Sequence, residues 1–311
     1  MPDLSIITPA FNEAGNLRDL HARISSAVLS LGLSFEWVVV DDGSRDATYD
    51  TLRQLAIEDP SVRGIRLSRN FGSHAAIACG LHAASGRAAV LLAADLQDPP
   101  ELLGPLVDAW GRGSQIVWAV RRRRDGSQGS HLGFARVYYW LMRRVAGLDM
   151  PPEGADCFLA DRVVLEAFRT LREPPSSIFA LLTWLGFRSS EVEYDKGTRA
   201  RGASGWTLRK KLRLVLDSLV SFTRVPIHAV AAAGAMLIAG AIVAALAAAA
   251  AGAGAAVWLA ALVLLLAGLQ LGAIALVGQY VWRALDDARQ RPAYVVAETT
   301  LDSTSFKTSS R

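Results

Sequence analysis

The sequence predicts an α/β domain with a mostly parallel sheet, followed by a C-terminal part that associates with a membrane. Two observations carry this prediction. Short apolar runs rich in Val and Ile alternate with segments of helical periodicity in the first part of the chain, and residues 225–282 contain no Asp, Glu, Lys or Arg. The first pattern is typical of strands that helices cover on both faces. The second is typical of membrane-spanning segments.

Five apolar runs of strand length define the predicted sheet. Helical periodicity at 16–31 and 46–57 places helices between the first three of them. Right-handed crossovers bring the carboxyl ends of parallel strands to one edge of the sheet, where open α/β proteins bind their ligands. The predicted strands are Leu4–Thr8, Phe35–Val40, Val62–Leu67, Ala88–Ala93 and Ile116–Val120.

Four polar segments follow the first four strands at this edge. They read "TPAFNE" (8–13), "DDGS" (41–44), "SRNFGSH" (68–74) and "ADLQDPP" (94–100), and three of the four contain carboxylates. No GxGxxG follows the first strand and no GxxxxGK[ST] occurs, which argues against dinucleotide-binding and P-loop sites. Carboxylates at such an edge suit a diphosphate bridged by a metal, with another acid that reads a ribose or a base.

The run "VLLAADLQDPPELL" contains one acid that local structure does not explain. The start of a helix accounts for Asp98 as the N-cap, for a proline at the first helical position and for Glu101 in the first turn. Asp95 follows directly on the apolar strand and has no such role. It is therefore the first candidate for a functional carboxylate.

The excess hydrophobicity of the chain lies near its C-terminus. Hydrophobic residues make up 51% of the sequence, and the mean hydropathy is +0.26. The charge-free stretch is more than twice the roughly 20 residues that cross a bilayer core. Glycines at 252 and 254 suggest a turn within it, so we expect two transmembrane helices, at about 227–250 and 256–282. A buried helical hairpin in a soluble core is the alternative.

The flanking charges orient these expected spans. Basic residues cluster before the first span and after the second, and none lies in the connecting turn. The positive-inside rule then predicts that both termini and the N-terminal domain are cytoplasmic. The beginning of the chain has no basic n-region of a secretory signal. With a net charge of +4 concentrated near the spans, we expect attraction to a lipid bilayer and no nucleic-acid partner.

The same patterns divide the chain into predicted parts. Residues 1–205 form the N-terminal α/β domain, with an amphipathic segment at about 128–147. A second amphipathic segment at 206–226 precedes the spans at 227–282. Both segments are expected to lie in the membrane interface, with ordinary surface helices as the alternative. Residues 283–311 are expected to form a disordered cytoplasmic tail.

Five motifs in order carry a family resemblance. "TPAFNEAGNL", "VVVDDGSRDAT", "LSRNFGSHAAIACGL", "ADLQDPPEL" and "RARGASGW" resemble family 2 glycosyltransferases of the polyprenyl-phosphate type. This group includes dolichyl-phosphate mannose synthases and bacterial enzymes that load sugars onto undecaprenyl phosphate. The resemblance implies a GT-A fold, a nucleotide-sugar donor with UDP preferred, and inverting transfer to a polyprenyl phosphate. It also implies a bacterial cytoplasmic membrane enzyme that serves cell-envelope glycan synthesis or modification.

The resemblance also implies roles for individual residues. Asp95 would hold the cofactor, Mg²⁺ or Mn²⁺, and would form the catalytic set together with Asp156 and Arg121. Asp42 corresponds to the acid that reads the base or ribose, and Asp156 to an acid that faces the sugar. The positions expected to bind the nucleotide-sugar are Pro9, Phe11, Glu13, Val40, Asp42, Ala94, Gln97 and Arg201.

Two departures from the family pattern leave alternatives open. Ala93 stands where the usual Asp-x-Asp motif has its first acid, so Asp95 is the remaining carboxylate. One carboxylate with phosphate oxygens and water suits Mg²⁺. His74 lies beside a position where some members have lysine, and it either contacts the diphosphate or is structural.

Three other classes of protein remain as alternatives. They are a catalytically inactive membrane scaffold, a subunit of a polysaccharide synthase, and a transporter. "QYVWR" at 279–283 is not the synthase motif, and the spans lack the charged residues that mark a transport pathway. Spans rich in Ala and Gly also pack well against copies of themselves, which is compatible with a homo-oligomer.

Overall fold

The structure is a computed structural model, and it describes most of the N-terminal half and part of the C-terminal half. The described residues are 1–122, 144, 151, 155–171, 177–195, 255–289 and 292–300.

The chain divides into two units. The first comprises residues 1–210 together with 292–311, and the second comprises residues 211–291. Helix α10 (Ala255–Arg289) is the element that the structure describes in the second unit. Within the described ranges, no helix has both the length and the apolar character needed to cross a membrane.

Several predicted parts are not tested by these residues. The first predicted span, the segment at 206–226 and, apart from residue 144, the segment at 128–147 lie outside the described residues. The second predicted span, 256–282, coincides with α10, so its helical character is confirmed. That it crosses a membrane stays a prediction, as do the first span and the predicted domain boundaries.

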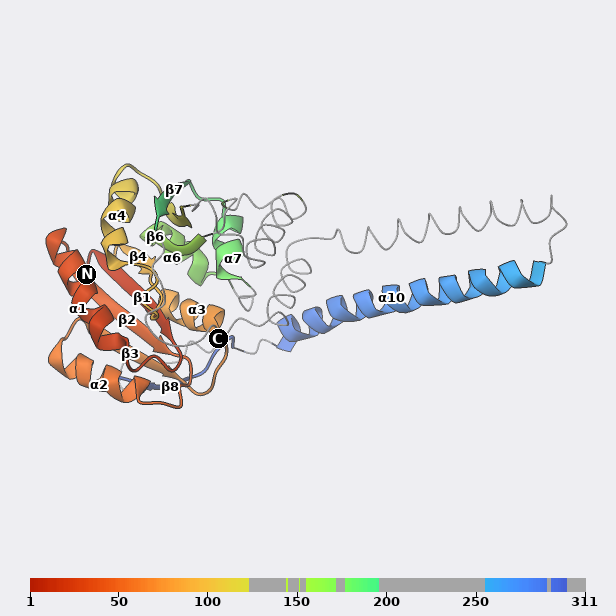
Figure 1. The fold of residues 1–311 in the computed structure, drawn as a ribbon, viewed down its shortest axis with the longest axis horizontal. Coiled ribbons are helices and arrows are strands. Elements are labelled where there is room, and N and C mark those ends of the chain that lie inside the picture. Colours follow the sequence, from red (N-terminus) through yellow and green to blue (C-terminus); the bar gives the residue numbers. More distant parts are fainter. Residues whose placement is uncertain are drawn as a thin grey trace. The chain divides into compact units, whose positions relative to one another are not determined.

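The described strands of the first unit form one eight-stranded mixed sheet (Figure 1). The strands are β1 (Leu4–Ala10), β2 (Phe35–Asp41), β3 (Val62–Leu67), β4 (Ala88–Leu91), β5 (Ile116–Arg121), β6 (Ala155–Asp161), β7 (Ser189–Tyr194) and β8 (Val296–Thr299). Their spatial order is β7-β5-β6-β4-β1-β2-β3-β8. The first four strands are parallel to one another. This confirms the predicted mostly parallel α/β sheet.

The remaining strands give the sheet its mixed character. Strand β6 is antiparallel to both β4 and β5, and it lies between them. Strand β7 is parallel to β5, and β8 is antiparallel to β3. All five predicted strands are present, with ends that differ from the prediction by at most two residues.

Helices cover both faces of the sheet because successive strand residues point to opposite faces. Alternate residues of β2 illustrate this, since Trp37 and Val39 belong to one core cluster while Val38 and Val40 belong to another. The first cluster packs beneath α1 (Leu17–Ser30), α2 (Thr48–Glu58), the 3-10 helix η1 (Pro100–Leu102) and α4 (Leu103–Gly111). The other face carries α3 (Ser73–Ala83), which contacts α6 (Arg162–Arg169) and α7 (Ile178–Trp184).

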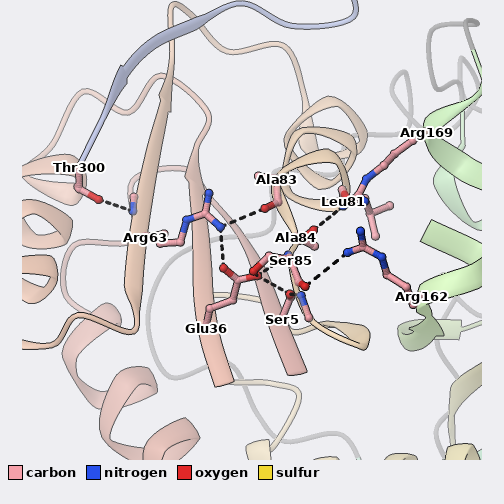
Figure 2. Close-up of polar contacts among 12 residues, drawn as sticks. Ser5, Glu36, Arg63, Leu81, Ala83, Ala84, Ser85, Arg162, Arg169 and Thr300 are labelled. Carbon is pink, nitrogen blue, oxygen red and sulfur yellow. Dashed lines mark hydrogen bonds and ion pairs between the residues drawn. The ribbon is translucent and has the colours of Figure 1, made fainter. Parts of the chain in front are cut away.

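A buried carboxylate organises the amino-terminal edge of the sheet (Figure 2). Glu36 Oε1 accepts hydrogen bonds from Ser5 Oγ at 2.5 Å and from the backbone N–H of Ser85 at 2.5 Å. Its Oε2 accepts from Arg63 Nη1 at 2.6 Å, and the same guanidinium also donates to the carbonyl of Ala83 at the end of α3. The cluster therefore ties the starts of three parallel strands to the C-terminus of a helix.

The expected disordered tail is partly ordered. Strand β8 pairs with β3, and Thr300 exchanges hydrogen bonds with Gly64, one of them from the Gly64 N–H to Thr300 Oγ1 at 2.8 Å. Tyr294 and Val296 pack against the core cluster of β2, β3 and α3. The prediction of disorder is therefore wrong for residues 292–300, because alternating apolar and polar residues there complete an edge strand. It is also wrong for 283–289, which belong to α10.

Candidate active site

The loops after β1 and β2 are fastened to each other at the carboxyl edge. The backbone N–H of Asn12 donates to Ser44 Oγ at 2.9 Å, and the N–H of Arg45 donates to Asn12 Oδ1 at 3.0 Å. Asn12 adopts a left-handed conformation with φ of 58°, which asparagine tolerates better than most residues. Two loops far apart in sequence therefore form one rigid rim.

The predicted donor-binding residues of the first strand lie on this rim or beside it. The Phe11 side chain is 43% exposed, so an aromatic surface is available to a ligand. Glu13 Oε2 accepts from Asn16 Nδ2 at 2.6 Å, which holds the carboxylate at the start of α1. Pro9 and Val40 are neighbours in the register of β1 and β2. Because the Val40 side chain is fully buried in the core, it presents no side chain to a ligand.

Asp42 organises the loop after β3. Its Oδ1 accepts from the backbone N–H of Phe71 at 2.7 Å, and its Oδ2 accepts from the N–H of Gly72 at 2.9 Å. Burial raises the pKa of the Asp42 carboxyl, and the two backbone N–H groups oppose that rise. The structure thus assigns Asp42 a loop-positioning role, and its role in reading the base or ribose stays a prediction.

Gly43 allows these two loops to approach closely. Its φ is +69°, and a Cβ added there would lie 2.6 Å from the backbone carbonyl carbon of Arg69. No side chain fits such a gap, so only glycine keeps the "DDGS" loop against the "SRNFG" loop. Close packing of the two loops therefore explains why the "DDGS" motif has a glycine at position 43.

Asp95 lies in a tight turn after β4. Its Oδ1 accepts from the backbone N–H of Gln97 at 3.2 Å, and the intervening Leu96 has a φ of 61°. A left-handed leucine costs about 1–2 kcal/mol, which the surrounding fold must offset. The preceding Ala94 is buried. The turn therefore holds the partly exposed Asp95 carboxylate in one orientation at the edge.

The described residues contain no group of three or more His, Cys, Asp or Glu side chains that suits a metal ion. Asp95 alone does not make a protein cage for a cation. A single carboxylate fits Mg²⁺ or Mn²⁺ where phosphate oxygens and water supply the other ligands. The residues present therefore suit a metal that arrives with a diphosphate.

A second group of side chains lies at the same edge, on β5, β6 and β7. Asp156 Oδ2 is 3.3 Å from Arg121 Nη2 and 3.5 Å from Tyr194 Oη. The Tyr194 hydroxyl donates to Asp98 Oδ1 at 2.6 Å. Two predicted site residues, Asp156 and Arg121, are thus brought together, and Tyr194 and Asp98 join them.

Asp98 does not cap a helix. Pro99 occupies the N-cap position of η1, and no side chain makes a capping hydrogen bond there. The Asp98 side chain is only 1% exposed and bonds to Tyr194 instead. The N-cap interpretation was wrong because a strand nearly a hundred residues later supplies a stronger partner than the local backbone.

His74 connects two helices on the other face. Its Nδ1 accepts from the backbone N–H of Ile178 at 3.4 Å, and its ring is edge-on to Phe179. Burial lowers the pKa of His74 to about 4, so the ring is neutral near pH 7. Of the two alternatives for His74, this geometry supports the structural one.

Comparison with known sequences decides the family. The family model described as "Glycosyl transferase family 2" matches residues 5–169. A glycosyltransferase of Synechocystis is 32% identical over 302 residues, covering 95% of both chains. The chain belongs to glycosyltransferase family 2.

The proteins similar to this glycosyltransferase also include a transferase that acts on a polyprenyl phosphate. The undecaprenyl-phosphate 4-deoxy-4-formamido-L-arabinose transferase of Pseudomonas aeruginosa is 32% identical, covering 94% of this chain and 89% of the relative. Among solved structures, glucosyl-3-phosphoglycerate synthase of Mycobacterium tuberculosis has a TM-score of 0.52 at 19% identity, covering 71% of this chain and 80% of that one. The latter likeness shows the fold, a GT-A-like α/β architecture.

Most predicted site residues of this glycosyltransferase lie at the one edge. Arg201 lies outside the described residues. Tyr194 was missed because it ends a polar-looking edge strand, "SSEVEY", that carries no motif. The alternation of that strand, with an aromatic at its end, was the available signal.

Proposed function

We propose that this glycosyltransferase moves a sugar from a nucleotide-diphospho-sugar, with a UDP-sugar preferred, onto undecaprenyl phosphate or a similar polyprenyl phosphate. The product is a polyprenyl-monophospho-sugar for cell-envelope glycans. The observation that carries the proposal is the likeness to an undecaprenyl-phosphate sugar transferase over 94% of this chain, which extends beyond the sheet to the C-terminal region. The edge with Asp95, Asp156 and Arg121 gives the proposal its chemistry.

We assign the donor diphosphate to the turn at Asp95. A divalent metal bound there would neutralise charge that develops on the leaving nucleoside diphosphate. Arg121 is half exposed at the end of β5 and supplies a fixed positive charge to the same group. A solved structure of the mycobacterial synthase holds Mn²⁺ and UDP, at a TM-score of 0.51 and 20% identity. That structure makes Mn²⁺ a suitable first cation to use.

The acceptor determines how the transfer proceeds. A phosphate monoester has a second pKa of about 6, so the lipid phosphate is largely ionised at neutral pH. It attacks the anomeric carbon directly, with inversion, and needs no strong general base. Asp156 therefore positions the sugar or the acceptor rather than removing a proton. Its ion pair with Arg121, at 3.3 Å, supports this assignment, because we assign Arg121 to the donor diphosphate.

We also propose that the enzyme acts at the cytoplasmic face of a bacterial membrane. Two features support this location. The acceptor in the proposed reaction is a lipid, and residues 225–282 carry no Asp, Glu, Lys or Arg while basic residues flank them. Two transmembrane helices at about 227–250 and 256–282 would then hold the catalytic unit close to its acceptor.

The test is transfer of a labelled sugar from a panel of UDP- and GDP-sugars to undecaprenyl phosphate in detergent. The reaction is run with Mg²⁺, with Mn²⁺ and with EDTA. We expect a labelled lipid from at least one donor, and its loss with EDTA. The Asp95→Asn variant should lose about 100-fold or more of this activity, since it removes the carboxylate that fixes the metal.

Asp108→Asn is the matched control, because Asp108 is an exposed acid on α4 away from the edge. It should retain wild-type activity. A protein that transfers no sugar from any donor would contradict the proposal and favour the inactive scaffold. Full activity of Asp95→Asn would contradict the role of Asp95 alone.

A further inference from the structure

Four side chains from four different segments form a continuous polar chain at the carboxyl edge. Asp98 follows β4, Tyr194 ends β7, Asp156 lies near the start of β6, and Arg121 ends β5. The successive contacts are 2.6 Å from Tyr194 Oη to Asp98 Oδ1, 3.5 Å from Tyr194 Oη to Asp156 Oδ2, and 3.3 Å from Asp156 Oδ2 to Arg121 Nη2. These contacts extend along the carboxyl edge from the turn at Asp95 to Arg121.

The phenol of Tyr194 lies at the centre of this chain and is a constant donor. Its side chain is buried at the end of β7. Burial raises the pKa of the Tyr194 phenol, and the nearby carboxylates of Asp98 and Asp156 raise it further, so the hydroxyl keeps its proton. The hydroxyl can donate its single proton to only one acceptor at a time, and two carboxylates lie close to it. At 2.6 Å, Asp98 is the acceptor, and Asp156 lies on the outer side of the same oxygen.

Asp98 transmits this contact to the metal-binding turn. It lies three residues after Asp95, across the left-handed Leu96, and directly before Pro99. This backbone has little freedom, since both the strained leucine and the proline restrict it. Fixing the Asp98 carboxylate from a distant strand therefore fixes the turn that presents Asp95.

We propose that Tyr194 is a positioning residue that couples the donor turn of Asp95 and Asp98 to Asp156 on the other side of the site. This inference rests on the proposed function. Tyr194 does not contact the reacting atoms in this account. Tyr194 holds Asp98 and Asp156, which come from separate segments, in one arrangement. The donor and the acceptor are then held in the orientation that the transfer needs.

The kinetic test compares variants of the full-length enzyme in the transfer assay. Tyr194→Phe keeps the ring and removes the hydroxyl, and we expect kcat to fall about tenfold or more while KM for the nucleotide-sugar changes less than about threefold. Asp98→Asn keeps an oxygen that accepts from the phenol and should retain kcat within about threefold. Asp98→Ala should resemble Tyr194→Phe.

The double variant distinguishes coupling from general damage. Tyr194→Phe and Asp98→Ala both remove the hydrogen bond between these two residues, so the loss of kcat in the double variant should be clearly smaller than the sum of the two single losses. Tyr294→Phe is the matched control, because this tyrosine is partly buried and its hydroxyl contacts His82 Nδ1 of α3 at 3.3 Å, outside the Asp98–Tyr194–Asp156–Arg121 group. It should keep wild-type kcat. Full kcat in Tyr194→Phe, or additive losses in the double variant, would overturn the inference.

Thermal unfolding of the same proteins separates this inference from the proposed function. Tyr194→Phe leaves the buried Asp98 carboxylate without this donor and should lower the unfolding temperature. Adding Asp98→Asn should restore part of the loss, because a neutral amide is less costly to bury than a carboxylate. If the wild type transfers no sugar, the proposed function fails, while this recovery would still show that Tyr194 fixes Asp98. Strictly additive losses would refute the coupling itself.

Discussion

At the scale of single residues, the donor edge and the opposite edge of the sheet use carboxylates differently. Asp95 accepts a hydrogen bond from a backbone N–H in a turn and remains partly exposed, which is compatible with the proposed metal-binding role. Glu36 at the amino-terminal edge is buried and saturated by Ser5, Ser85 and Arg63 (Figure 2). Because its oxygens already accept these hydrogen bonds, the Glu36 carboxylate stabilises the fold and does not bind a ligand.

Glu36 therefore yields a prediction on stability and its pH dependence. Burial by itself would raise the pKa of Glu36, but the hydrogen bonds from Ser5, Ser85 and Arg63 outweigh it and lower the pKa below its ordinary value. Glu36→Gln should reduce the free energy of unfolding at neutral pH by about 1–3 kcal/mol. The pKa of Glu36 is lower in the folded than in the unfolded protein. The stabilisation is therefore fully present above the pKa of unfolded glutamate, about 4.3, and is lost as the pH falls through the lower pKa of the folded protein.

Urea unfolding of wild type and Glu36→Gln at several pH values measures this difference. The gap between the two proteins should narrow as the pH falls from neutral to below about 4. Glu58→Gln is the control, because Glu58 makes an exposed ion pair with Arg18, and such pairs contribute about 0–1 kcal/mol. A gap for Glu36→Gln that stays constant with pH would contradict the account.

The sequence predicted the grouping of residues after the parallel strands better than the grouping on β5, β6 and β7. Asp95, Asp42, Phe11 and Glu13 follow parallel strands, and the carboxyl-edge rule alone brings such residues together. The contact of Asp156 with Arg121 depends on β6 running antiparallel between β4 and β5, and no local pattern specifies that insertion. Asp98 was misread for the same reason, since its partner lies on a distant strand.

At the scale of elements, strand β8 lies in a segment that was predicted to be disordered. It extends the sheet beyond β3, with Glu298 opposite Arg66 in register and 3.3 Å from its guanidinium. Four residues give a weak periodic signal, and the strand pairs across more than two hundred residues of sequence. The five predicted strands are local and strongly apolar, whereas pairing partners of this kind are set by tertiary contacts.

Replacing Val296 tests whether β8 stabilises the catalytic unit. Val296 packs against the core cluster of β2 and β3, whereas the adjacent Ala297 is exposed. Val296→Asp should lower the free energy of unfolding by about 1–3 kcal/mol, since it places a charge against apolar side chains. Ala297→Asp, on the opposite face of the same strand, should cost less than about 0.5 kcal/mol. A cost of Val296→Asp in urea unfolding as small as the cost expected for Ala297→Asp would contradict a stabilising role of β8.

At the scale of the whole molecule, a catalytic unit and a charge-free C-terminal stretch occur in one chain. The proposed reaction gives a reason for this combination, because one substrate is soluble and the other is confined to a bilayer. We expect the full-length protein to float with liposomes in a density gradient and to resist extraction by alkaline carbonate, as proteins with transmembrane helices do. Recovery of the protein in the aqueous fraction would contradict the proposed spans.

The central claim is that a sugar becomes linked to the phosphate of a lipid, and ³¹P NMR of the purified product tests it most directly. A phosphate monoester titrates with a pKa of about 6, whereas a sugar phosphodiester has no ionisation in that range. The account predicts one phosphorus signal that no longer shifts between mildly acidic and mildly alkaline pH and that couples to an anomeric proton. A signal that still titrates, or the paired signals of a diphosphate, would contradict it.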